Sequence, residues 1–159
     1  MFSAAGTRSR SLRDMCDRHA PTMMVSMGVV TRDGFGQWIA LYEELWRTPG
    51  TERLGELFAE EATYRHSPYE PAVTGLTDIA ADWERGRNGA DEDFTMSAEI
   101  VAVDGDTGVA RVAVAYGPPE DQEYLDLWVA RFDAHGRCVA FEEWPFWPNQ
   151  PWVAGAVRD

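Results

Sequence analysis

The sequence predicts one α+β domain in which three N-terminal helices pack on a strongly curved, mainly antiparallel sheet. Two observations predict this fold class. In the first half, apolar residues recur at the spacing of a helix, with one short strand between the second and third helices. From about residue 93 onward, apolar and polar residues alternate with the period of two that strands show. Helices followed by a run of strands are the arrangement of the α+β class.

The first helix is expected over residues 34–46. Its apolar stripe has i, i+3, i+4, i+7 and i+8 spacing and consists of Trp38, Leu41, Tyr42, Leu45 and Trp46. A second helix is expected over residues 52–59, followed by a strand over residues 62–67. A third helix is expected over residues 78–87, with Thr77 as its N-terminal cap.

The second half is expected to form four antiparallel strands over residues 94–103, 109–116, 124–132 and 138–147. One face of the third of these strands carries a carboxyl group among bulky rings, namely Tyr124, Asp126, Trp128, Ala130 and Phe132. A carboxylate among aromatic side chains is costly to bury unless it has a partner or a chemical task. This strand face therefore predicts a pocket.

Composition and charge exclude several classes of partner. The net charge of −13 argues against binding to nucleic acid or to an anionic membrane surface. The two cysteines, Cys16 and Cys138, do not form a disulfide framework, so a cytoplasmic location is expected. No apolar run approaches the roughly 18 residues that a membrane span needs.

Residues 1–27 differ from the remainder, with four arginines against Asp14 and Asp17. They are expected to be a disordered leader or a non-native start upstream of Met27, and residues 28–159 are expected to form the single domain.

Several short segments occur in a characteristic order and spacing: LFAEEATY at residues 57–64, Gly75 with the helix ending in Trp83, VDGD at 103–106, RFDAHGR at 131–137 and Glu143-Trp144. Together they resemble the nuclear transport factor 2-like superfamily, with the cone fold of SnoaL-like and ketosteroid isomerase-like proteins. The resemblance covers residues 35–147 and implies a cone-shaped cavity. The superfamily contains enzymes, ligand binders and docking domains, so function does not follow from the fold.

The resemblance also suggests catalytic positions. The tyrosine of ketosteroid isomerases falls on Tyr42, and their base position falls on His66. Their second acid falls on Trp128, with Asp126 one inward step away. This departure argues against steroid isomerisation, and a His with an Asp and a Tyr is nearer in type to the dehydratases. His66, Asp126 and Tyr42 are therefore the catalytic candidates.

Each candidate has a structural alternative. Tyr42 could orient a carbonyl or hydroxyl of the substrate, or it could be a core residue with its hydroxyl at the rim. His66 could shuttle a proton near neutral pH, or it could be a hydrogen-bonded residue at a strand end. Asp126 could act as an acid, as a base or as the group that orients His66, or it could form an ion pair with Arg111 on the neighbouring strand. The side chains expected to bind substrate are Tyr64, Trp83, Tyr116, Tyr124, Trp128, Phe141 and the inward-facing Glu143.

Three functions remain open at this point. The first is a small cofactor-free enzyme of isomerase, dehydratase, cyclase or epoxide hydrolase type, acting on an apolar, oxygen-bearing small molecule. The second is a non-catalytic binder of such a molecule, and the third is a dimeric interaction module. All three predict a homodimer formed through the outer face of the sheet. The wide spacing of the three histidines predicts no metal site.

Overall fold

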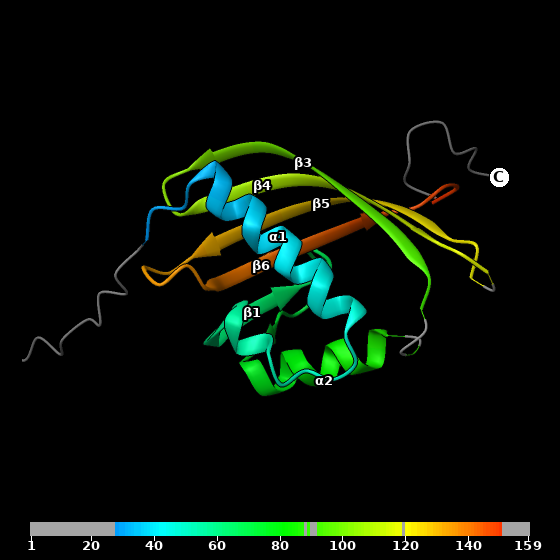
Figure 1. Ribbon diagram of the computed structural model, residues 1–159, viewed down its shortest axis with the longest axis horizontal. Helices are drawn as coiled ribbons and strands as arrows, with labels where there is room; N and C mark the ends of the chain where they lie inside the picture. The colour runs from blue at the N-terminus through cyan, green and yellow to red at the C-terminus, as the bar shows by residue number, and fades with distance from the viewer. Residues whose placement is uncertain (1–27, 88, 90–91, 119, 151–159) are drawn as a thin grey trace, which may run out of the picture.

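The computed structural model describes residues 28–87, 89, 92–118 and 120–150. The expected leader at residues 1–27 lies outside the described residues. Within them, a six-stranded sheet with the strand order β2-β1-β6-β5-β4-β3 carries the helices α1 and α2. Figure 1 shows α1 crossing one face of the strongly curved sheet and α2 lying beside β1. The predicted α+β class and curved sheet are confirmed.

Helix α1 (Arg32–Arg47) forms because its ends and one face have the expected chemistry. The Thr31 hydroxyl caps it by accepting a 3.0 Å hydrogen bond from the Gly34 amide. The apolar face of the helix is buried against the sheet and consists of Phe35, Trp38, Ile39, Tyr42 and Leu45. The Trp38 ring packs against those of Phe132 on β5 and Phe141 on β6. This packing places Tyr42 over the sheet.

The prediction of a second helix over residues 52–59 is wrong, and the described residues form two α-helices instead of three. Residues Leu54–Glu56 form a single 3₁₀ turn, and strand β1 already begins at Phe58 and runs to Arg65. A segment of eight residues is too short to gain much from helix formation. Pairing of β1 with β6 offers backbone hydrogen bonds instead, including one of 2.7 Å from the Cys138 amide to the Leu57 carbonyl.

Helix α2 (Leu76–Gly86) follows the two-residue strand β2 (Val73–Thr74). Its N-terminal cap is Gly75 with a φ of 90°, and no side chain caps the helix. The prediction of Thr77 as the N-terminal cap is wrong, because Thr77 lies within the first turn of α2. Positive φ suits glycine, which lets the chain turn sharply from β2 into α2. The buried residues of α2 are Ile79 and Trp83.

The remaining strands are β3 (Phe94–Asp104), β4 (Thr107–Tyr116), β5 (Glu123–Phe132) and β6 (Cys138–Phe146). Consecutive strands among these four pair antiparallel, whereas β1 and β6 pair in parallel. In the β5–β6 register, Asp126 lies opposite Pro145 and Trp128 lies opposite Glu143. Asp126 and Glu143 are therefore diagonal neighbours on one face of the sheet. No helix among the described residues is long and apolar enough to cross a membrane.

Candidate functional site

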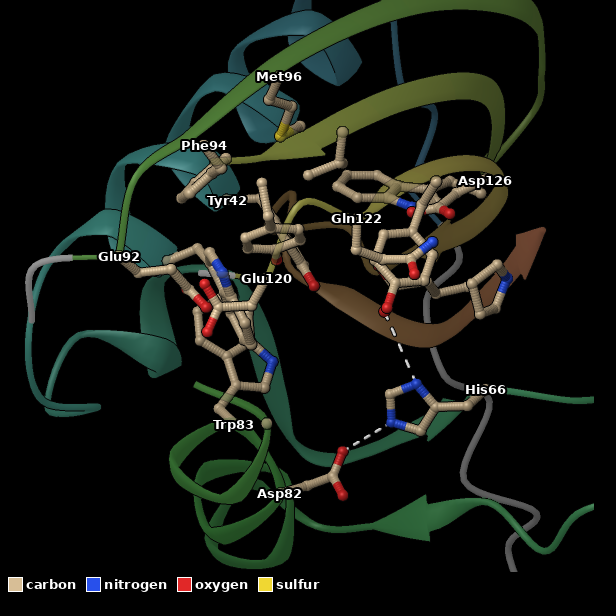
Figure 2. A pocket seen from close by; sticks show the side chains of 18 of the residues that line it. Tyr42, His66, Asp82, Trp83, Glu92, Phe94, Met96, Glu120, Gln122 and Asp126 are labelled. Atoms are coloured by element: carbon tan, nitrogen blue, oxygen red, sulfur yellow. Dashed lines mark hydrogen bonds and ion pairs between the residues drawn. The ribbon is translucent and has the colours of Figure 1, made fainter. Parts of the chain in front are cut away.

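A cavity of about 380 Å³ lies between α1, α2 and the curved sheet (Figure 2). Its volume falls within the range of about 300–1,000 Å³ that small-molecule sites show. Nine of the ten predicted site residues line it, namely Tyr42, Tyr64, His66, Trp83, Tyr116, Tyr124, Asp126, Trp128 and Glu143. The tenth, Phe141, is only 1% exposed and stacks on the Tyr64 ring in the core instead.

His66 is held at the end of β1 by two carboxyl groups. Its Nε2 lies 2.7 Å from Asp82 Oδ2, and its Nδ1 lies 3.7 Å from Glu143 Oε2 (Figure 2). Because a carboxylate only accepts hydrogen bonds, Nε2–H is the donor to Asp82. In the neutral imidazole this leaves the Nδ1 lone pair directed toward Glu143. The ring is 40% exposed, so a ligand can reach it.

The group that orients His66 is thus Asp82 on α2, and not Asp126 as the sequence suggested. Asp82 is fixed in turn by a hydrogen bond from the Arg85 guanidinium. A sequence signal for it exists: Asp82 is three residues after Ile79 and adjacent to Trp83, the two residues that α2 buries. Its side chain therefore lies at the border of the buried helix face.

Two buried tyrosines form a hydrogen-bonded chain that ends at Glu143. The Tyr64 hydroxyl donates to Glu143 Oε2, and the Tyr42 and Tyr64 hydroxyl oxygens are 3.0 Å apart. Since Tyr64 uses its proton toward Glu143, Tyr42 must donate to Tyr64. Burial raises the pKa of both phenols well above the usual value, with Glu143 adding to the effect, so both stay protonated donors.

Burial raises the pKa of Glu143 as well, because the charged carboxylate loses its hydration. The hydrogen bond from Tyr64 and the nearby His66 act in the opposite direction without reversing the rise. Glu143 is therefore the point where the tyrosine chain and the His66–Asp82 pair meet.

Asp126 is the most exceptional group in the cavity wall. It is only 7% exposed, and its Oδ1 has no hydrogen-bond partner in the described part of the chain. Burial first, and then the nearby Glu143, raise its pKa to about 7, and the Trp128 indole acts in the opposite direction without reversing the rise. The alternative of an ion pair with Arg111 is wrong, because Arg111 bonds to Glu99 at 3.2 Å on the exposed side of the strands. Asp126 can therefore gain or lose a proton near neutral pH.

The fold and this site have counterparts among known proteins. The family model of the SnoaL-like domain matches residues 38–141. The chain belongs to the SnoaL-like domain family. This membership confirms the resemblance to the nuclear transport factor 2-like superfamily. A comparison with curated proteins finds no match for the chain.

Solved structures share the fold of this SnoaL-like domain at low sequence identity. A Kribbella flavida DSM 17836 protein, provisionally assigned as a ketosteroid isomerase, is 15% identical, with 80% of this chain and 90% of that chain covered and a TM-score of 0.56. SalBIII, an epoxide hydrolase/cyclase-like enzyme of pyran ring formation in the polyether salinomycin, is 14% identical, with 70% and 89% covered and a TM-score of 0.57. A Methylobium petroleophilum PM1 protein of unknown function with a cystatin-like fold is 16% identical, with 82% and 85% covered and a TM-score of 0.58.

Sequence reasoning missed the mouth of the cavity in this SnoaL-like domain. Besides Asp82 and Arg85, the lining includes Trp46 from α1, Phe94 and Met96 from β3, and three polar residues that precede strands, Glu92, Glu120 and Gln122. Loop residues carry no periodicity, so nothing in the local sequence indicates which way their side chains point. Among the described residues, no three or more His, Cys, Asp and Glu side chains are grouped to hold a metal ion.

Proposed function

We propose that this SnoaL-like domain is a cofactor-independent enzyme that moves a proton between two positions of an apolar, oxygen-bearing small molecule. The observation that carries the proposal is Asp126, a buried carboxyl with a pKa of about 7 in the wall of a cavity that a ligand can enter. A group with a pKa near the working pH is the best compromise for giving and accepting protons.

The second half of the acid–base machinery is His66. It faces the same cavity and is oriented by Asp82, so one group can remove a proton while the other delivers one. In an isomerisation the proton removed from one carbon returns to another. In a dehydration the base removes a C–H proton while the acid protonates the departing hydroxyl. In epoxide opening the acid protonates the ring oxygen while the base activates the attacking hydroxyl or water.

The rest of the lining suits substrates that are largely apolar. The rings of Trp83, Trp128, Tyr116 and Tyr124 offer apolar contact area, and Gln122 offers an amide that can accept or donate a hydrogen bond. SalBIII has the same fold and is an epoxide hydrolase/cyclase-like enzyme, so epoxides belong among the compounds to be tested.

The test is a screen of purified protein against epoxy alcohols, β-hydroxy ketones and β,γ-unsaturated ketones, with products followed by chromatography and mass spectrometry. We expect at least one class to be converted about 100-fold faster than without protein. Tight binding of these compounds without product would favour the binder instead. Absence of both conversion and binding across the panel would contradict an apolar ligand in this cavity.

We also propose that the chain works as a homodimer through the outer face of the sheet. Leu125 on β5 and Phe146 on β6 are register partners on that face, and Leu125 is 68% exposed. Exposed apolar neighbours of this kind are unusual unless a partner covers them. We expect sedimentation velocity at about 10 μM to show a dimer that Leu125→Arg converts to a monomer. Tyr69→Arg, at an exposed loop residue, is the matched control, and a monomeric wild type would refute the dimer.

A further inference from the structure

The cavity of this SnoaL-like domain is unusually rich in acidic side chains. Among the described residues, five carboxyl groups line it, and they come from five separate places in the chain: Asp82, Glu92, Glu120, Asp126 and Glu143. Figure 2 shows Glu92 and Glu120 on the side of the cavity opposite His66, so the acids surround the space. A ligand in the cavity therefore meets carboxyl groups from several directions.

Few positive charges oppose these acids. The basic side chains that line the cavity in the described part of the chain are Arg85 and His66. Arg85 is 71% exposed and bonds to Asp82 at the rim. Two further arginines lie over rings of the lining: the Arg47 guanidinium is 3.8 Å from the centroid of the Phe94 ring, and that of Arg87 is 5.5 Å from the centroid of the Trp46 ring. Their hydrogen bonds go to Glu43 from Arg47 and to the carbonyls of Gly50 and Leu45 from Arg87. Within the described residues, no arginine bonds to Asp126 or Glu143, and His66 is the basic side chain beside Glu143.

Asp126 gives a second and independent indication of a ligand. Its side chain is buried, and its Oδ1 makes no hydrogen bond within the described residues. The polar group that acts on it is the Trp128 indole, a neutral donor that does not balance the charge of a carboxylate. The ionisable groups around it are Tyr42 on α1, Tyr124 on its own strand and Glu143 on β6. None of these carries a positive charge. A positively charged ligand would supply the partner that the protein itself does not provide.

Aromatic rings occupy much of the remaining wall. Trp83, Trp128 and the edge-to-face pair of Tyr116 and Tyr124 line the same cavity, beside Trp46, whose ring already lies next to the Arg87 guanidinium. The negative face of an aromatic ring attracts a cation, and it also provides apolar contact for the uncharged part of a ligand. Carboxyl groups interleaved with aromatic rings suit an organic ammonium ion far better than an organic anion.

We propose that the substrate of this cavity carries a protonated amine beside its apolar, oxygen-bearing part, with Asp126 and the surrounding rings as the ammonium site. The proposal rests on the proposed function, because it assigns the chemical class of substrate to the same cavity. The ammonium group lowers the pKa of Asp126 in the complex, so Asp126 acts there as the base and His66 as the acid. It predicts that ligands of equal shape bind in the order ammonium, then alcohol, then carboxylate.

The test compares 2-naphthylmethylamine, 2-naphthalenemethanol and 2-naphthoate by isothermal titration calorimetry. At pH 8 we expect the amine to bind about tenfold or more tightly than the alcohol, because a charge-assisted contact replaces a neutral one. Equal or tighter binding of the alcohol or the naphthoate would overturn the proposal. So would the absence of amine binding up to about 5 mM.

Two variants locate the effect. Asp126→Asn keeps the shape of the side chain and removes its charge, so the preference for amine over alcohol should shrink about tenfold. Glu99→Gln makes the same change of charge on the exposed side of the sheet, where Glu99 pairs with Arg111, and should leave the preference unchanged. An equal loss of preference in both variants would show a non-specific charge effect and would overturn the assignment to Asp126.

The pH dependence gives an internal check. Because the pKa of Asp126 is about 7, its carboxylate is mostly protonated at pH 6 and mostly charged at pH 8. Amine affinity should therefore rise several-fold from pH 6 to pH 8, with release of protons, whereas alcohol affinity should stay nearly constant.

The binding measurements do not depend on turnover, so the ammonium site and the proposed catalysis are tested separately. If the amine preference holds and no compound is converted, the proposed catalysis fails alone; if neutral substrates are converted without any preference, only the ammonium site fails.

Discussion

Asp126→Asn is expected to make the protein more stable above neutral pH and at the same time almost inactive. The pKa of Asp126 rises from its ordinary value of 3.8 to about 7, so the folded state holds this proton more tightly than the unfolded state does. Stability from such a group is fully present below the unfolded pKa and is lost as the pH rises through the folded one. With about 1.4 kcal/mol for each tenfold change in proton affinity, the loss at pH 8 reaches at most about 4 kcal/mol.

An asparagine at this position avoids that loss but stays polar and buried, so we expect a net gain of roughly 1–3 kcal/mol at pH 8 and little gain at pH 4. Urea unfolding of the wild type and the variant at both pH values measures this difference. Glu99→Gln is the exposed control, and its effect should be small at both pH values. A variant with the same pH slope as the wild type would show that Asp126 has an ordinary pKa.

The turnover rate of Asp126→Asn should fall although its stability rises. Without a group that can exchange a proton in the cavity wall, turnover of any substrate found by the screen should fall about 10²- to 10⁴-fold. Full activity in Asp126→Asn would remove Asp126 from the mechanism. A gain of stability with a loss of activity is expected when a destabilising group takes part in the reaction.

His66→Gln is expected to lower kcat/KM by about 10²- to 10⁴-fold, because His66 is the second proton carrier in the proposed mechanism. Asp82→Asn should cost less, roughly tenfold, since it removes the carboxylate that orients the imidazole but leaves the imidazole in place. Asp82 does not itself exchange a proton with substrate here, so it is a positioning residue.

The double variant distinguishes positioning from general damage. If Asp82 acts through His66, Asp82→Asn should have almost no further effect once His66 is replaced. Asp82→Asn alone should also shift the pH profile of kcat/KM, which a merely structural role would not do. Asp78→Asn makes the same chemical change on an exposed position of α2 and should leave the profile unchanged. Fully additive losses for His66 and Asp82 would contradict the pairing.

Much of the site could be predicted from the periodicity of single helices and strands. Alternation along β5 placed Asp126, Trp128 and Tyr124 on one face, and the same alternation along β6 separated the inward Glu143 from Glu142. The helical stripe of α1 placed Tyr42 toward the sheet. These predictions hold because each depends on the repeat of a single element, which the sequence shows directly.

The segment before β1 shows where local patterns become ambiguous. Leu54, Leu57 and Phe58 have helical spacing, and the same spacing also suits a 3₁₀ turn that leads into a strand. Parallel pairing with β6, some 80 residues later, decided the outcome by offering hydrogen bonds to the backbone of β1. A distant partner of this kind leaves no local trace.

The sequence by itself determined the fold class, the family and the strand faces that line the cavity. Only the tertiary structure decided that His66 pairs with Asp82, that Tyr42 donates to Tyr64, and that Asp126 has no arginine partner. The physical reason is that hydrogen bonds and pKa values depend on distances between elements. Those distances follow from the strand register and from how α1 and α2 pack on the sheet, and neither repeats along the chain.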